Sequence, residues 1–185
     1  MTSRVTSIGL FVVVDESEGC RQTLQYVGAL AGEQERFRIC LGYVLPFLPA
    51  ELLEFGGAED PKKEVVLGRQ LKQEQKHWLS VARREARNVL QKAQSILRHA
   101  NVARTALKTA LLFLPEGQDP VDAIVKTAAA HQCHTIVIAK RPVSRLQELF
   151  GGDLAEKLVH RAHGPAIWVT SPTSTRIGKR HKATM

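Results

Sequence analysis

Residues 138–153, IAKRPVSRLQELFGGD, contain the side chains of this chain that are best suited to binding an anion. Lys140, Arg141 and Arg145 can hold a phosphate group through charge-assisted hydrogen bonds. Asp153 begins a pattern typical of a helix, and the first N–H groups of a helix also bind phosphate. The stretch is therefore predicted to be a phosphate-binding loop, a loop that has lost phosphate binding, or a solvated connection.

The carboxylate of Asp153 competes with a bound anion for the same helix amides. The run DLAE, residues 153–156, matches a capping box, in which the first side chain accepts hydrogen bonds from the amides of its own helix. The carboxylate would also repel a phosphate 4 Å away by about 1 to 4 kcal/mol, depending on the local dielectric. A bridging divalent cation would instead make Asp153 a metal ligand.

Two further residues could take part in chemistry near the start of the chain. Asp15 directly follows the apolar run 7–14, SIGLFVVV, and could contact a ligand or bind a nearby amide in a cap or turn. Cys20 falls in the first turn of a predicted helix, where the pKa of a thiol can be lowered. No base and orienting group accompany Cys20, so we expect no catalytic site.

Two histidine pairs, His131 with His134 and His160 with His163, have the i, i+3 spacing found in some metal sites. The first pair straddles the end of a helix and the start of a strand, so its members are not expected to share a face. Neither pair has a carboxylate or thiol at a spacing that completes a ligand set. We therefore expect no metal site.

Strand and helix patterns alternate along the chain and must position these residues. Apolar runs rich in β-branched residues predict strands, and apolar residues at spacings of three and four predict helices. Asp119 before Pro120 marks a helix start, and Gly32 marks a helix end. The alternation predicts an α/β fold with an open, mostly parallel five-stranded sheet and helices on both faces. Strands are expected at residues 7–14, 37–45, 104–114, 133–139 and 165–171, with helices from about 17–32, 64–99, 119–132 and 153–163.

One domain is expected over residues 1–172, with two unusual segments inside it. Residues 46–63 are predicted to be a loop excursion rich in proline and glycine, whose large apolar residues need cover from the domain or from a protein partner. Residues 64 to about 99 are predicted to be one long helix, which either breaks, early near Gly68, or overhangs the domain. Residues 173–185 are predicted to be a basic, disordered tail.

The composition restricts the classes of protein to which this chain could belong. Forty-four per cent of the 185 residues are hydrophobic, which is enough for a core, yet no apolar run approaches the roughly 20 residues that span a membrane. The apolar run near the N-terminus ends in acids without a cleavage site, so we predict a strand and not a signal peptide. The three cysteines are odd in number and far apart, which favours a reducing cytoplasm.

The formal net charge of +8 raises the question of a nucleic-acid partner. The tail supplies four of the cations, which leaves +4 for the remainder, so the body is expected to be only mildly basic. The chain has only ten Phe, Trp and Tyr residues and no motif that reads a nucleic-acid groove. Binding to nucleic acid is therefore the least favoured function, and the tail is its expected source.

Four segments, taken in order, resemble the universal stress protein family. They are VVVDESEGCRQTLQYVGALA, FRICLGYVLP, EGQDPVDAIVKTAAAHQCHTIVIAKR and GGDLAEKLVHRAHGPAIWV, and they span most of residues 5–170. The resemblance implies an adenine-nucleotide α-hydrolase-like, Rossmann-like fold and a homodimer formed through the last strand, residues 165–171. Residues 48–80 are more extended than the resemblance leads us to expect.

Nucleotide-binding members of this family have a loop of the form Gly-x-x-Gly, nine residues, then Gly-Ser or Gly-Thr. Aligned with that motif, this chain has Ala139, Pro142 and Asp153 at three of the four positions, and only Gly152 matches. Pro142 has no N–H donor and fixes φ near −65°, so the loop loses backbone chemistry that holds phosphate. The resemblance also implies an adenine contact from Val14 and Val44 and a ribose contact from Asp15. The candidate nucleotide or anion site therefore comprises Val14, Asp15, Val44, Ala139, Lys140, Arg141, Arg145, Gly152 and Asp153.

These observations predict a cytoplasmic regulatory or binding module that acts as a homodimer. We expect it to be no enzyme, to need no cofactor, and to have lost or altered the usual ATP-binding loop. The alternative is a protein that still binds ATP or another adenine nucleotide, with basic side chains in place of the glycine loop.

Overall fold

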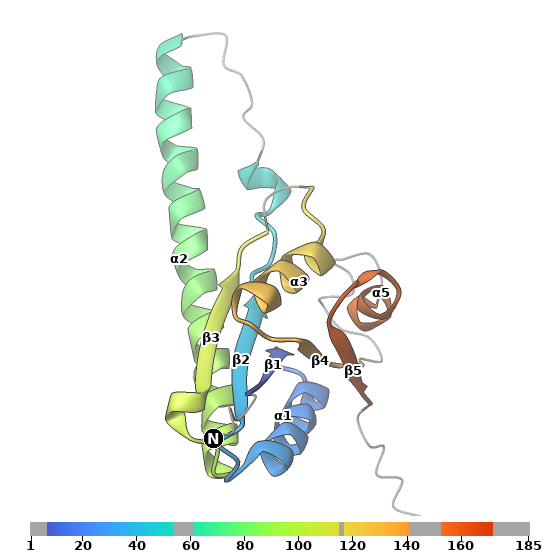
Figure 1. Cartoon of the computed structure of the whole chain (residues 1–185). Helices are drawn as coiled ribbons and strands as arrows, with labels where there is room; N and C mark the ends of the chain where they lie inside the picture. The colour runs from blue at the N-terminus through green and yellow to red at the C-terminus, as the bar shows by residue number, and fades with distance from the viewer. Residues whose placement is uncertain (1–6, 54–60, 115–116, 141–152, 172–185) are drawn as a thin grey trace, which may run out of the picture.

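A computed structural model describes residues 7–53, 61–114, 117–140 and 153–171 of the chain (Figure 1). Within them, strands and helices alternate as the sequence predicts. The strands are β1 (Ile8–Val13), β2 (Phe37–Val44), β3 (Leu107–Leu112), β4 (Thr135–Ala139) and β5 (Ala166–Thr170). The helices are α1 (Glu18–Ala31), α2 (Pro61–His99), α3 (Pro120–Ala130) and α5 (Leu154–Arg161), with short 3₁₀ turns at Ala50–Leu52 and Arg104–Ala106.

The five strands form one sheet in the order β3-β2-β1-β4-β5, and every described pair is parallel. The chain builds the sheet from β1 towards β3 in one direction and then from β4 to β5 in the other. Strand order therefore reverses between β1 and β4, which is where open α/β sheets bind ligands. The predicted fold class is confirmed.

Strand β1 is buried on both faces because helices cover both sides of the sheet. Leu10, Phe11 and Val12 have no exposed surface. Phe11 and Val13 belong to a core that includes α3 and α5, whereas Leu10 and Val12 belong to a core that includes α1 and α2. This alternation follows from the two-residue period of a strand and explains why the sequence of β1 is apolar without interruption.

Local signals in the sequence place several helix ends correctly. Gly32 follows the last residue of α1, as predicted. The carboxylate of Asp119 accepts a hydrogen bond from the Val121 amide at 2.8 Å, with Pro120 as the first residue of α3. These ends depend on residues that are neighbours in the chain, so the sequence alone could predict them.

Helix α2 is longer than predicted and has no break. It starts at Pro61, three residues before the expected start, and continues through Gly68 to His99. Proline fits the first turn of a helix, and a single glycine costs only about 1 kcal/mol inside one. The N-terminal part of α2 extends beyond the end of the sheet (Figure 1). The excursion predicted at residues 46–63 is correspondingly shorter.

The third predicted strand also differs in its bounds. Residues 104–106 form a 3₁₀ turn, and β3 ends at Leu112 instead of residue 114.

Gly42 on β2 is required by the close approach of a neighbouring side chain. A Cβ atom at this position would overlap the ring of Phe11, which is fully buried and has no room to move. We expect Gly42→Ala to lower the free energy of unfolding by about 1 to 3 kcal/mol through overpacking, as measured by urea denaturation. Gly19→Ala is the control, because a Cβ there makes only an ordinary 3.5 Å contact. Equal stability of the two variants would contradict this account.

Candidate functional site

The candidate site lies where β1 and β4 end, at the reversal of strand order. Val14 and Asp15 follow β1, and Lys140 follows β4. Gly19, in the first turn of α1, lies against this point: a Cβ on it would be 3.5 Å from that of Ala139 and 3.7 Å from the Lys140 carbonyl oxygen. The fold thus brings the ends of both strands and the start of α1 together.

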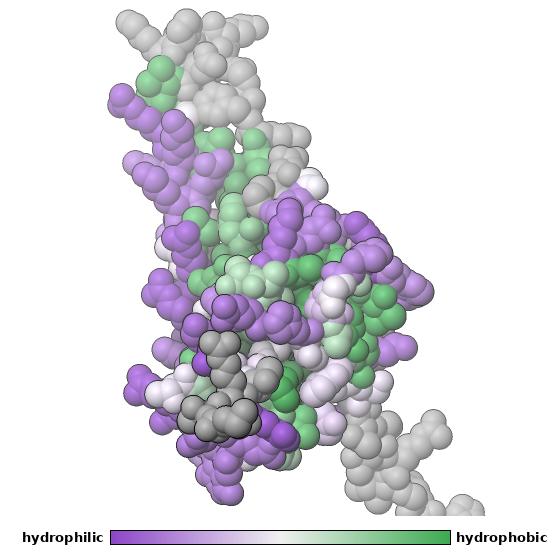
Figure 2. Space-filling model, in the orientation of Figure 1, coloured by the Kyte–Doolittle hydropathy of each residue, from purple (hydrophilic) through white to green (hydrophobic). Residues whose placement is uncertain are grey.

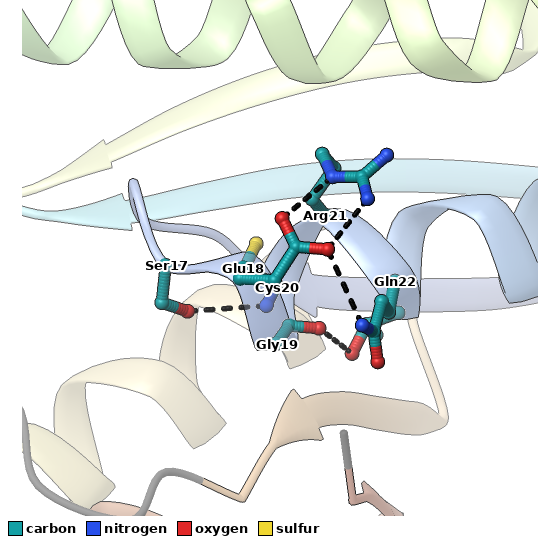
Figure 3. Close-up of polar contacts among 7 residues, drawn as sticks. Ser17, Glu18, Gly19, Cys20, Arg21 and Gln22 are labelled. Carbon is teal, nitrogen blue, oxygen red and sulfur yellow. Dashed lines mark hydrogen bonds and ion pairs between the residues drawn. The ribbon is translucent and has the colours of Figure 1, made fainter. Parts of the chain in front are cut away.

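Asp15 is held in the turn that leads into α1. Its Oδ1 atom accepts a hydrogen bond from the Ser17 amide at 2.6 Å. The Ser17 hydroxyl in turn accepts a hydrogen bond from the Cys20 amide at 3.1 Å, so Ser17 and not Asp15 is the cap (Figure 3). The geometry supports the structural alternative that the sequence left open, in which Asp15 binds a nearby amide.

The first turn of α1 carries a further acid. The carboxylate of Glu18 accepts hydrogen bonds from Arg21 and, at 3.2 Å, from Gln22 (Figure 3). The hydrogen bond from Arg21 lowers the pKa of Glu18 below its ordinary value. An ionised acid stabilises the start of a helix but repels an anion there. The start of α1 is therefore stabilised by its own side chains and would repel an anionic ligand.

The second helix at the site, α5, is capped by Asp153, as predicted. Its Oδ1 atom accepts a hydrogen bond from the Ala155 amide at 3.0 Å. Among the hydrogen bonds of the described residues, none runs from the Asp153 amide to the Glu156 carboxylate, so only half of the predicted capping box forms. The cap alone is enough to occupy an amide that a phosphate would use.

A cavity of about 310 Å³ lies beside this cap and contains the start of the candidate loop. Lys140, Asp153 and Glu156 all contribute to its wall. One cation and two acids make this described wall a poor anion site without further positive charge. Arg141, Pro142, Arg145 and Gly152, which were also predicted as parts of the loop, lie outside the described residues. The cavity is lined by Lys140, Asp153, Ala155, Glu156, Val159, His160 and Val169.

Cys20 corrects one expectation from the sequence. Its position in the first turn of α1 suggested a lowered thiol pKa, but burial raises the pKa of Cys20 to about 12. Burial likewise raises the pKa of Cys40 to about 12. At Cys20 the loss of water around the thiol outweighs the effect of the helix terminus, and the sequence shows only the terminus.

A polar contact that the sequence did not reveal joins α1 to the edge strand β5. Thr23 is only 2% exposed, and its hydroxyl donates to the Gly19 carbonyl at 2.8 Å. The same hydroxyl shares a short hydrogen bond with that of Thr170. A groove of about 610 Å³ runs beside this contact, between α1 and β5. In the sequence, this contact could have been suspected because the polar Thr23 interrupts the apolar face of α1.

The described part of the chain contains neither a candidate metal site nor a candidate membrane-spanning helix. No group of three or more His, Cys, Asp and Glu side chains is arranged there to hold a metal ion. None of the described helices combines the length and the apolar character needed to cross a membrane.

Comparison with protein families matches residues 10–170 to the universal stress protein family. Comparison with curated proteins finds no match. Among solved structures, a universal stress family protein from Burkholderia pseudomallei has 20% identity and a TM-score of 0.56, with 91% of this chain and 98% of that chain covered.

Two other structures show the same fold. The hypothetical protein MJ0577 has 15% identity and a TM-score of 0.60, with 90% of this chain and 96% of that chain covered. A universal stress protein in complex with cAMP has 12% identity and a TM-score of 0.53, with 90% and 98% covered.

Burial makes the three thiols chemically inert in the folded protein. Cys20, Cys40 and Cys133 are all buried. We expect no reaction with a chromogenic disulfide reagent at pH 8, because a thiol with a pKa of about 12 is almost fully protonated and because the reagent cannot reach it. All three should react in a denaturant, which serves as the positive control. Rapid labelling of any thiol in the native protein would contradict this account, and labelling of Cys20 would show a reactive cysteine beside the site.

Proposed function

The chain belongs to the universal stress protein family, and from that premise we propose that it is a cytoplasmic regulatory binding module. It acts as a homodimer, is no enzyme, and has lost the glycine loop that holds nucleotide phosphates. The cytoplasmic location rests on the three free, buried cysteines, which are stable in a reducing compartment.

The observation that carries this proposal is the occupied start of α5. The carboxylate of Asp153 already accepts the Ala155 amide. A phosphate at the same helix terminus would have to displace this bond and would face a like charge. Proline at position 142 removes another backbone donor, and alanine at position 139 disfavours a positive φ. These changes together argue against ATP binding by the usual route.

The absence of an activated nucleophile supports a binding role over catalysis. Desolvation raises the pKa of the Cys20 thiol beside the site, which leaves it protonated at neutral pH. Asp15 already accepts a hydrogen bond from a backbone amide. Among the described site residues, no base lies in a position to activate a hydroxyl or thiol.

A second candidate function is the binding of an adenine nucleotide through side chains. Lys140 lines the cavity beside α5, and Arg141 and Arg145 follow it in the sequence. Side-chain guanidinium and ammonium groups can hold phosphate without a glycine loop. The structure in complex with cAMP concerns another protein with this fold and makes an adenine nucleotide the first ligand to test.

The open edge of the sheet supports the proposed homodimer. Among the described strands, β5 pairs with β4 alone. The Ala166 amide and the Thr170 carbonyl bond towards β4, so the backbone groups of Ile167 and Val169 point to the open edge. Val169 is 39% exposed. An exposed parallel edge with apolar side chains pairs readily with a second strand.

A protein partner near the excursion is a separate part of the proposal. Leu53 is 43% exposed, and Leu52 lines a groove of about 620 Å³ with Trp78 and Val81 of α2. Exposed apolar side chains around a groove favour contact with another protein. Phe55, which the sequence adds to this apolar set, lies outside the described residues.

The loss of phosphate binding can be tested by restoring two positions of the loop. We expect the wild-type protein to give no binding heat with ATP and Mg²⁺ at about 1 mM, which is the weak end of the affinity scale. The variant Pro142→Gly/Asp153→Ser should bind measurably, because it regains a backbone donor and loses a like charge. Asp122→Asn is the control, since Asp122 is an exposed acid in the first turn of α3.

The calorimetry also separates the two candidate functions. Sub-millimolar binding by the wild-type protein, weakened by Asp15→Ala, would favour the second candidate and contradict the loss of nucleotide binding. Failure of the restored variant to bind would show that Pro142 and Asp153 are not the reason.

The dimer can be tested at the edge of β5. Light scattering of the wild-type protein at micromolar concentration should give twice the chain mass of 20.5 kDa. We expect Val169→Pro to give a monomer, because proline removes an edge N–H that does not bond to β4. Val169→Thr keeps that N–H and should remain dimeric. A monomeric wild-type protein would exclude the homodimer.

A further inference from the structure

Helix α2 has a net charge almost as large as that of the whole chain. It contains ten Lys or Arg residues and three Glu residues, a net charge of +7, whereas the whole chain has +8. The tail, residues 173–185, has four cations and no acid, so all other residues together have −3. Without the tail the body is mildly basic at +4, as the sequence predicts, but this charge is uneven, because one helix is strongly basic and the remaining residues together are acidic.

Six of these cations form a stripe on one face of α2. Their separations of three, four and seven residues bring most of them to the same side of a helix, within an arc of about 120°. All six side chains are exposed. The stripe is about 27 Å long at 1.5 Å per residue. This basic stripe consists of Arg69, Lys72, Lys76, Arg83, Arg84 and Arg87.

No acid neutralises the basic stripe within the described residues. Glu74 and Glu85 lie on roughly the opposite side of the helix, at 100° per residue. The ion pair that α2 makes in the described part of the chain joins Lys92, outside the stripe, to Glu16. The uncharged residues within the arc between the first and last cation are Gln73 and Ser80, which can also hydrogen-bond to phosphate and sugar oxygens.

Packing of the opposite side of α2 keeps the stripe pointing outwards. Ala82, Ala86 and Val89 are buried against the sheet side of the molecule. Figure 2 shows hydrophilic side chains along the outer edge of α2 and apolar side chains on its inner side. The stripe also lies over the β2–β3 side of the sheet, away from the edge strand β5, so pairing through β5 would leave it open.

We propose that the basic stripe binds the phosphate backbone of a duplex nucleic acid, without reading its sequence. A rigid row of cations about 27 Å long meets the regular negative charge of a duplex, which carries one charge per about 1.7 Å of axis. Arginine predominates in the stripe, and its guanidinium group forms paired hydrogen bonds with phosphate.

Three other polyanionic partners fit the stripe less well. A membrane surface needs an apolar helix face that can insert along the cations. Ala82, Ala86 and Val89 are buried within the protein, and the exposed Val65, Val66 and Leu67 all lie before the first cation of the stripe. A single-stranded nucleic acid needs aromatic side chains for base stacking, and the arc of the stripe contains none. An acidic protein would be expected to meet a less regular pattern of charge than six cations on one helical line.

The experiment measures binding of the full-length chain to a labelled duplex by fluorescence anisotropy. The probes are a 25-base-pair DNA and an RNA of the same length, each titrated at several salt concentrations. The test variant is Arg83→Gln/Arg84→Gln/Arg87→Gln, which keeps good helix formers at exposed positions. The plot of log affinity against log salt should become shallower by about 3, and affinity near 0.1 M salt should fall on the order of tenfold or more.

Two controls remove positive charge elsewhere in the full-length chain. Arg38→Gln/Lys108→Gln/Lys126→Gln removes the same charge from exposed residues of β2, β3 and α3. It should leave the salt dependence nearly unchanged. A tail variant replaces the four basic residues of 173–185 with Gln and should retain the binding that α2 provides. Circular dichroism of each variant checks that the helices are intact. The tail substitutions are at Arg176, Lys179, Arg180 and Lys182.

The outcomes distinguish binding by the basic stripe from binding by the tail, from an effect of net charge alone and from binding to a membrane. Weaker binding of either duplex by the α2 variant alone supports the proposal, and the DNA and RNA arms show which duplex is preferred. Equal losses in the α2 variant and the charge-matched control would show that only net charge matters and would overturn it. Loss confined to the tail variant, or binding to phosphatidylserine vesicles but to neither duplex, would also overturn it.

Discussion

Strand β1 pairs with β2 on one side and with β4 on the other, and both of its faces are buried. This position organises the rest of the molecule, because the chain leaves β1 in one direction for β2 and β3 and returns to its other side for β4 and β5. Helices α1 and α2 consequently cover one face, and α3 and α5 cover the other. The reversal beside β1 also creates the crevice in which a ligand would lie.

The chemistry of that crevice is decided by competition for the ends of helices. Backbone amides at a helix start bind a phosphate or a side chain of the protein, and the same N–H group cannot serve both equally well. At α1 the hydroxyl of Ser17 takes one amide, and at α5 the carboxylate of Asp153 takes another. Each cap stabilises its helix by about 0.5 to 2 kcal/mol. The protein thus keeps the fold of the universal stress protein family while its side chains satisfy helix ends that a phosphate could use.

The net charge of the chain does not show how unevenly its charged residues are distributed in the fold. A sum of +8 describes a weakly basic protein, yet the residues outside α2 and the tail are acidic on balance. Because the apolar side of α2 is held against the sheet, its cations are presented together on one exposed face. Which partner such a surface binds depends on the spacing and orientation of its cations, and the net charge gives neither.

Sequence alone determined the features that depend on neighbours in the chain or on a simple period. The alternation of strands and helices, the caps at Asp119 and Asp153 and the end of α1 at Gly32 could be predicted because local hydrogen bonds and burial periods set them. The tertiary structure decided what depends on residues far apart: the raised pKa of Cys20, the Thr23–Thr170 contact and the unbroken length of α2. In these cases burial and long-range packing outweighed what the neighbouring residues predict. The elements that remove water from a thiol, or that pack against a long helix, lie far away in the sequence.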